Sequence, residues 1–161
     1  MTPRATFPAL AVILSVLLAG CFGAEEEADR EPDSDTTAEA EPSDFESLSG
    51  AEIPESAESV EVFSVGDVDS LPTYVATFTL PDEEDARAFC ESGSIGNYLP
   101  VSGGELLDEQ HERHFIGETE LVDPHKCSSA KQGENVDRSV VFSFPEAERV
   151  SVWAVAEEFG R

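Results

Sequence analysis

The sequence predicts an α+β domain, in which a mainly antiparallel sheet of about four to five strands carries one helix on one face. Three observations support this fold class. Two neighbouring segments in the middle of the chain alternate like a strand pair, two more do so near the C-terminal end, and one stretch between the pairs has the start and stop signals of a helix. We also expect one disulfide within the domain.

The first predicted strand pair lies between residues 60 and 80. Apolar side chains alternate with polar or smaller ones from Thr73 to Leu80, which gives this strand a core face and an opposite face. Val60–Val65 is rich in β-branched residues and is followed by Gly66 and Asp67, which favour a turn. We therefore predict a hairpin that turns within the sequence GDVDSLP.

The predicted helix follows directly after this hairpin. Asp82 is a suitable N-cap, and the acidic residues behind it favour the positive end of a helix. At helical spacing, Ala86, Phe89 and Cys90 share one face, and Gly93 supplies a stop.

Two further predictions complete the sheet. The sequence HFIGETELV, residues 114–122, is interpreted as another strand. Two segments on either side of the sequence PEAE also alternate. One face would carry Val140, Phe142 and Phe144 of the first segment and Val150, Val152 and Ala154 of the second, and the residues between them would point the other way. This pattern predicts a C-terminal hairpin.

The N-terminal residues have the pattern of an export signal. Arg4 is the only charged residue before Glu25, and the apolar run Phe7–Leu18 has the length of a signal-peptide core. The four residues that end with Cys21 (Leu-Ala-Gly-Cys) resemble the bacterial lipobox. The resemblance implies that residues 1–20 are removed and that the thiol of Cys21 carries a lipid, which would anchor the chain to a membrane.

The alternative is an uncleaved helix over Phe7–Ala24, with Cys21 incidental. This run is interrupted and is shorter than the roughly 20 apolar residues that a membrane-spanning helix needs. In both cases the single positive charge precedes the apolar run, so the positive-inside tendency places the rest of the chain outside the cytoplasm.

Acidic residues dominate the chain, with 35 Asp and Glu against 9 Lys and Arg and a formal net charge of -26. This balance disfavours nucleic acid as a partner. Residues 21–52 are especially acidic and poor in large apolar residues, so we interpret them as a disordered linker and residues 53–161 as the single domain. The acid could instead attract cations or a basic partner.

Three other groups of residues are candidate sites. If Cys21 carries lipid, Cys90 and Cys127 remain as an even pair in an exported protein, which predicts a disulfide; the alternative is a nucleophile or metal ligand. His111 and His114 would share one side of a helix and could bind zinc or copper together with His125, whereas an extended backbone would separate them. Trp153 either packs under a helix or stands exposed as a binding anchor.

The whole chain resembles small lipoproteins of actinobacteria. The resemblance rests on the lipobox, the acidic linker, the passage from strand to helix in FTLPDEEDARAF, and the closing hairpin in SVVFSFPEAERVSVWAV. These proteins have no settled activity, so the resemblance implies a location and transfers no functional residue.

We therefore expect a non-enzymatic, lipid-anchored binding or interaction module on the extracytoplasmic face of the cell membrane. It would use no cofactor, and its partner would be an envelope protein or a cationic molecule. The alternative is a metal- or cation-binding accessory lipoprotein that uses His111, His114 and His125. A hydrolase ranks third, because no nucleophile motif or metal triad is recognisable in the sequence.

Overall fold

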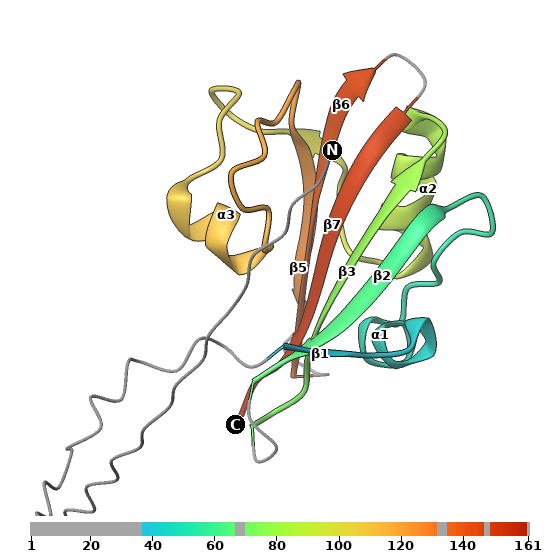
Figure 1. Ribbon diagram of the computed structural model, residues 1–161, viewed down its shortest axis with the longest axis vertical. Coiled ribbons are helices and arrows are strands. Elements are labelled where there is room, and N and C mark those ends of the chain that lie inside the picture. Colours follow the sequence, from blue (N-terminus) through green and yellow to red (C-terminus); the bar gives the residue numbers. More distant parts are fainter. Residues whose placement is uncertain (1–36, 67–69, 132–134, 147–148, 161) are drawn as a thin grey trace, which may run out of the picture. The chain divides into compact units, whose positions relative to one another are not determined.

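In the part of the chain that the structure describes, one sheet of seven antiparallel strands forms the centre of the domain (Figure 1). The computed structural model describes residues 37–66, 70–131, 135–146 and 149–160. The strands are β1 (Thr37–Glu39), β2 (Glu58–Val65), β3 (Thr73–Leu80), β4 (Leu99–Pro100), β5 (His125–Lys131), β6 (Val136–Glu146) and β7 (Arg149–Glu158). Their order across the sheet is β1-β2-β3-β7-β6-β5-β4. The mainly antiparallel sheet is confirmed, but the expected four to five strands and single helix are too few.

Both predicted hairpins are present. β2 pairs with β3 and β6 pairs with β7, each antiparallel. The hairpins join at the centre of the sheet, where Ala76 of β3 lies opposite Ala154 of β7. The two strand pairs that alternate most clearly in the sequence therefore supply the four central strands.

The predicted helix is α2 (Glu83–Ser92), and it begins and ends where the sequence indicates. The Asp82 side chain accepts a hydrogen bond from the backbone N–H of Asp85 at 3.0 Å. Gly93 follows the last turn, where a Cβ atom would lie 2.5 Å from the Cβ of Ala51. Glycine therefore allows the end of α2 to approach the chain that follows the first helix.

The predicted start of the folded domain at residue 53 is wrong. β1 and the helix α1 (Pro42–Ser49) belong to the domain, although both lie in the segment interpreted as a disordered linker. Phe45 is only 1% exposed, because α1 packs against the sheet. This buried aromatic side chain supplies the hydrophobic contact that the acidic sequence around it lacks.

The predicted strand over residues 114–122 is also wrong. The helix α3 (Asp108–Arg113) ends just before this segment, and turns follow it. Phe115 has φ 54° and Gly117 has φ 65°, which are left-handed conformations outside the φ range of a regular strand. The strand β5 begins later, at His125.

Both faces of the sheet are covered, but to different extents. α1 and α2 pack on the first face over a large apolar core that includes Phe78 and Phe142. The second face is covered by the chain around α3, over a smaller cluster that consists of Val101, Leu106, Ile116 and Val141. The predicted packing of a helix on one face is thus completed by a second, smaller layer on the other.

The predicted signal peptide and lipobox, residues 1–21, lie outside the described residues. Within the part of the chain that the structure does describe, no helix has both the length and the apolar character to span a membrane.

Candidate binding groove

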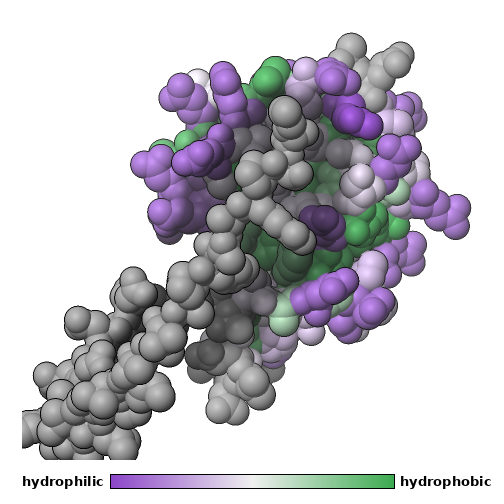
Figure 2. Space-filling view, in the orientation of Figure 1, coloured by the Kyte–Doolittle hydropathy of each residue, from purple (hydrophilic) through white to green (hydrophobic). Residues whose placement is uncertain are grey.

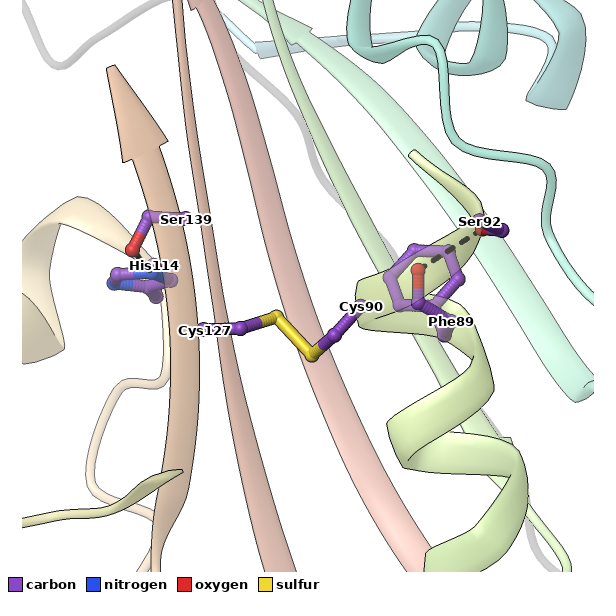
Figure 3. The surroundings of a disulfide bond; sticks show 6 residues. All are labelled: Phe89, Cys90, Ser92, His114, Cys127 and Ser139. Atoms are coloured by element: carbon purple, nitrogen blue, oxygen red, sulfur yellow. Dashed lines mark hydrogen bonds between the residues drawn. A yellow bond between two sulfur atoms is a disulfide. The ribbon is translucent and has the colours of Figure 1, made fainter. Parts of the chain in front are cut away.

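The predicted disulfide between Cys90 and Cys127 is present (Figure 3). It connects α2 to β5, with the two Cα atoms 6.2 Å apart. Each half-cystine is 1% exposed and belongs to the large core. These two cysteines therefore act as a buried cross-link in this structure.

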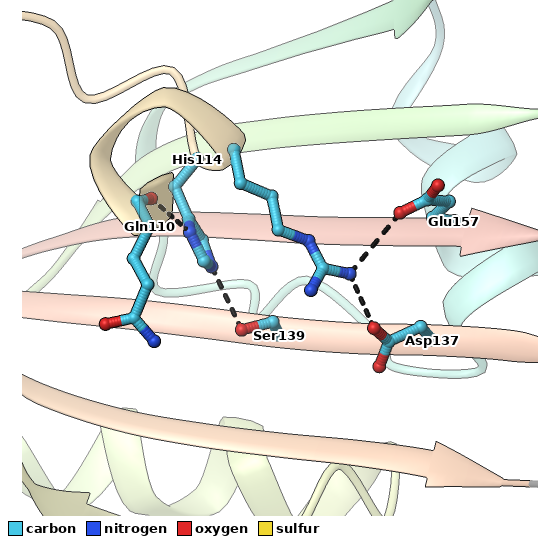
Figure 4. A network of polar contacts seen from close by, with 6 residues as sticks. Gln110, His114, Asp137, Ser139 and Glu157 are labelled. Carbon is cyan, nitrogen blue, oxygen red and sulfur yellow. Dashed lines mark hydrogen bonds and ion pairs between the residues drawn. The ribbon is translucent and has the colours of Figure 1, made fainter. Parts of the chain in front are cut away.

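His114 is buried on the second face of the sheet, directly after α3. One ring nitrogen, Nδ1, lies 2.8 Å from the carbonyl oxygen of Gln110, and the other, Nε2, lies 3.0 Å from the hydroxyl of Ser139 (Figure 4). Because a carbonyl only accepts hydrogen bonds, Nδ1 carries the proton, and Nε2 of the neutral ring accepts from Ser139. The side chain thus anchors the end of α3 to β6.

Burial lowers the pKa of His114 from its ordinary value of 6.5, and the positive charge of nearby Arg113 lowers it further. The unfolded chain therefore binds a proton near pH 6.5 that the folded chain still excludes, so stability is present above this pH and is lost as the pH falls below it.

We predict that His114→Gln reduces this loss between about pH 6.5 and 5.5, where one histidine contributes at most about 1.4 kcal/mol per pH unit. Urea unfolding of both proteins at several pH values measures the free energy of unfolding. If this free energy falls with pH as steeply in the variant as in the natural chain, the prediction is contradicted.

His125 lies on the first face of the sheet, opposite Phe142 of β6. Its ring stacks on Tyr98 with the centroids 4.9 Å apart, and the guanidinium of Arg87 lies 4.5 Å from the centroid of the same Tyr98 ring. Burial, reinforced by the Glu83 carboxylate, raises the pKa of Tyr98. His125 is thus part of an aromatic stack that covers one end of the core.

The structure does not bring the three candidate metal-binding histidines together. His114 and His125 occupy opposite faces of the sheet, and His111 is half-buried on α3. Among the described residues, no group of three or more His, Cys, Asp or Glu side chains is arranged to hold a metal ion.

Trp153, the candidate binding anchor, is half-buried and packs against the small cluster under the α3 segment. On β7 it lies between Thr77 of β3 and Val141 of β6. The sequence left open whether Trp153 is packed or exposed, and the structure has the packed arrangement. The indole lies at the border of the area that the chain around α3 covers.

Beyond that border, a hollow lies between α3 and the β2–β3 side of the second face. Its floor is a row of side chains across three strands, since Phe63 of β2 lies opposite Val75 of β3, which lies opposite Val155 of β7. Two cavities of about 770 and 280 Å³ occupy the hollow, and both are lined by Val65 and Phe115. Because they share these residues, we treat them as one feature and call it the sheet-face groove.

Apolar and acidic groups both line the sheet-face groove. In the orientation of Figure 1, apolar atoms are visible in the hollow beside α3, with hydrophilic residues around it (Figure 2). The carboxylates that line the groove belong to Glu61, Glu109, Glu112, Glu157 and Glu158. Arg113 is the one basic side chain among the described lining residues.

The positive charge of Arg113 is already engaged within the protein. Its guanidinium lies 2.6 Å from the carboxylate of Asp137 and 3.4 Å from that of Glu157 (Figure 4). The surplus of carboxylates therefore makes the sheet-face groove negative as well as apolar.

None of the three candidate sites singled out in the sequence forms this groove. Its lining comes from β2, β3 and β7, the turn between β2 and β3, α3 with Phe115 behind it, and Thr37 of β1. The sequence contained only part of the necessary signal. Alternation from Thr73 to Leu80 placed Val75 on the face opposite the predicted core, but it did not show which part of that face is covered by other segments.

Comparisons with known proteins gave no match: no family model, no curated protein and no solved structure matches this chain.

Proposed function

We propose that this protein is a lipid-anchored binding module on the extracytoplasmic face of the cell membrane, and that the sheet-face groove is its binding surface. The observation that carries the binding role is the groove itself, where the exposed apolar side chains of Phe115 and Phe159 lie beside several carboxylates. The lipobox sequence around Cys21 supports the location. The absence of an enzymatic activity stays a prediction.

The exposure of Phe115 favours a ligand on this surface. This aromatic side chain is 43% exposed and contributes to both cavities of the groove. Aromatic side chains that stand beside a hollow are typical anchors of binding surfaces, because they bury a large area when a ligand covers them. The combined size of the groove is also in the range of sites that hold ligands.

A photo-crosslinking experiment tests this proposal in cells that naturally produce the full chain. We predict that a benzophenone amino acid in place of Phe115 forms an adduct of discrete mass, and that this adduct is found in the membrane fraction. The same amino acid in place of Leu107 is the matched control, since Leu107 is 69% exposed and precedes α3 but lies outside the groove. Equal adducts from both positions, or none from residue 115, would exclude the groove as the binding surface.

The same cells test the anchor independently. In the Cys21→Ala variant the chain should leave the membrane fraction, because the thiol that would carry the lipid is missing. A variant that stays in the membrane fraction with unchanged mass would show that the lipid anchor is wrong, whatever the crosslinking result.

A further inference from the structure

The sheet-face groove combines features that restrict the chemistry of its ligand. We propose that it binds a segment of another polypeptide in which Lys or Arg residues accompany apolar side chains. This inference rests on the proposed function, because it assigns a ligand class to the same groove.

The floor of the groove requires apolar groups in the ligand. Phe63, Val75 and Val155 form a continuous row across three strands. Phe115 and Phe159 also line the groove and are 43% and 37% exposed. Val75 and Val155 are each 2% exposed, so the apolar surface still open to a ligand belongs mainly to these two phenylalanines. A ligand without apolar side chains would leave their rings in contact with water and would gain no hydrophobic stabilisation from them.

The carboxylates around the floor require positive charge in the ligand. They come from three separate elements, with Glu61 on β2, Glu109 and Glu112 on α3, and Glu158 at the end of β7, whereas Glu157 is already paired with Arg113. Among the described residues, no three of these groups are arranged to hold one metal ion. A polypeptide segment with several basic side chains can place one beside each group while its apolar side chains lie on the floor.

The same charges disfavour other occupants. Residues 24–36 of this chain contain seven Asp or Glu and a single Arg, so the groove repels the N-terminal segment of its own chain. A second copy carries the same net charge of -26, and phosphate groups of nucleic acid or lipid are also negative. A basic segment of a different protein is the occupant whose charge complements the groove.

Three synthetic peptides test this inference with the full chain in mild detergent at low ionic strength. The first alternates lysine with leucine or phenylalanine, the second has glutamate in place of lysine, and the third has serine in place of the apolar residues. We expect only the first to bind with measurable heat in calorimetry. If the serine-containing basic peptide binds as tightly, the attraction is purely electrostatic and the inference is overturned.

Two groove variants, each with a matched control, locate the binding. Phe115→Asn removes the ring and keeps a residue that tolerates the left-handed backbone, so the turn should fold. It should weaken binding of the first peptide by about tenfold or more, whereas Leu107→Asn should change it less than about twofold. The pair Glu109→Gln and Glu112→Gln should weaken binding by about fivefold or more.

The control for this charge pair is Glu84→Gln with Glu91→Gln, which removes the same charge from α2 on the first face of the sheet. An equal loss of affinity in both pairs would show that net charge alone attracts the peptide, and would overturn the inference. If crosslinking at residue 115 succeeds but the first peptide binds without dependence on Phe115, the ligand class is wrong and the groove remains the binding surface. If crosslinking fails, the proposed function fails with it.

Discussion

Removal of the Cys90–Cys127 disulfide is expected to lower the free energy of unfolding by about 4 kcal/mol. The bond closes a loop with a sequence separation of 37 residues, and without it the unfolded chain gains the corresponding conformational freedom. Both sulfur atoms are buried in the large core, so the double variant Cys90→Ala and Cys127→Ala also loses packing. The combined effect should lower the midpoint of thermal unfolding by at least about 10 °C.

Urea unfolding of the full chain, with and without a reducing agent, measures this effect. The reductant should destabilise the natural chain nearly as much as the double substitution does. It should leave the double variant unchanged, which controls for effects of the reductant elsewhere. A natural chain whose unfolding curve does not move on complete reduction would contradict the assigned role of the bond.

The elements predicted correctly are those whose signals are local. In β3 the apolar side chains Phe78 and Leu80 face the large core, while alternate residues such as Thr77 face the other side. In α2 the N-cap Asp82 and the stop at Gly93 mark both ends within the helix sequence itself. Such signals act between residues a few positions apart, so the sequence displays them directly.

The missed elements depend on distant contacts. α1 has only eight residues and a strongly acidic environment, and its stability comes from Phe45, which packs under strands far away in the chain. Two signals in the sequence could have indicated it, namely Pro42 in the first turn and Gly50 after the last, where φ is 69°. β4, with two residues, exists only because it pairs with β5.

The wrong strand prediction has a specific physical origin. His114 and Ile116 are buried while Phe115 between them is exposed, and this is the alternation that a strand would show. Here a turn produces it, because Phe115 adopts a left-handed conformation. The error also concealed the groove, since it assigned Phe115 to a strand instead of to the edge of a hollow.

Substitution of Arg138 should have the second large effect, because its buried guanidinium connects the ends of two helices. Arg138 is 3% exposed, and its Nη1 donates hydrogen bonds to the carbonyl oxygen of Ser49 at 2.7 Å and to that of Gly93 at 2.9 Å. These carbonyls lie at the C-terminal ends of α1 and α2, where helix carbonyls have no partner within the helix. Positive charge also complements the negative end of each helix dipole.

The variant Arg138→Met keeps an unbranched side chain but leaves both carbonyls without this donor. Removal of a buried charge relieves a desolvation cost, but the carbonyls remain buried, so the balance should be unfavourable. We expect a loss of about 3 kcal/mol in the free energy of unfolding, with an intermediate loss for Arg138→Lys, whose ammonium can still donate. Amide hydrogen exchange should become faster in the last turns of α1 and α2.

The matched control is Arg149→Met, which removes an exposed arginine whose guanidinium lies 3.8 Å from the Glu58 carboxylate. An exposed ion pair of this kind contributes less than about 1 kcal/mol, so the two variants should differ clearly in the same urea titration. Equal stability of Arg138→Met and Arg149→Met would mean that other donors reach the helix ends when the guanidinium is absent. Arg138 would then be replaceable, and the contact between α1 and α2 would depend on Phe45 and the close approach of Gly93 to Ala51.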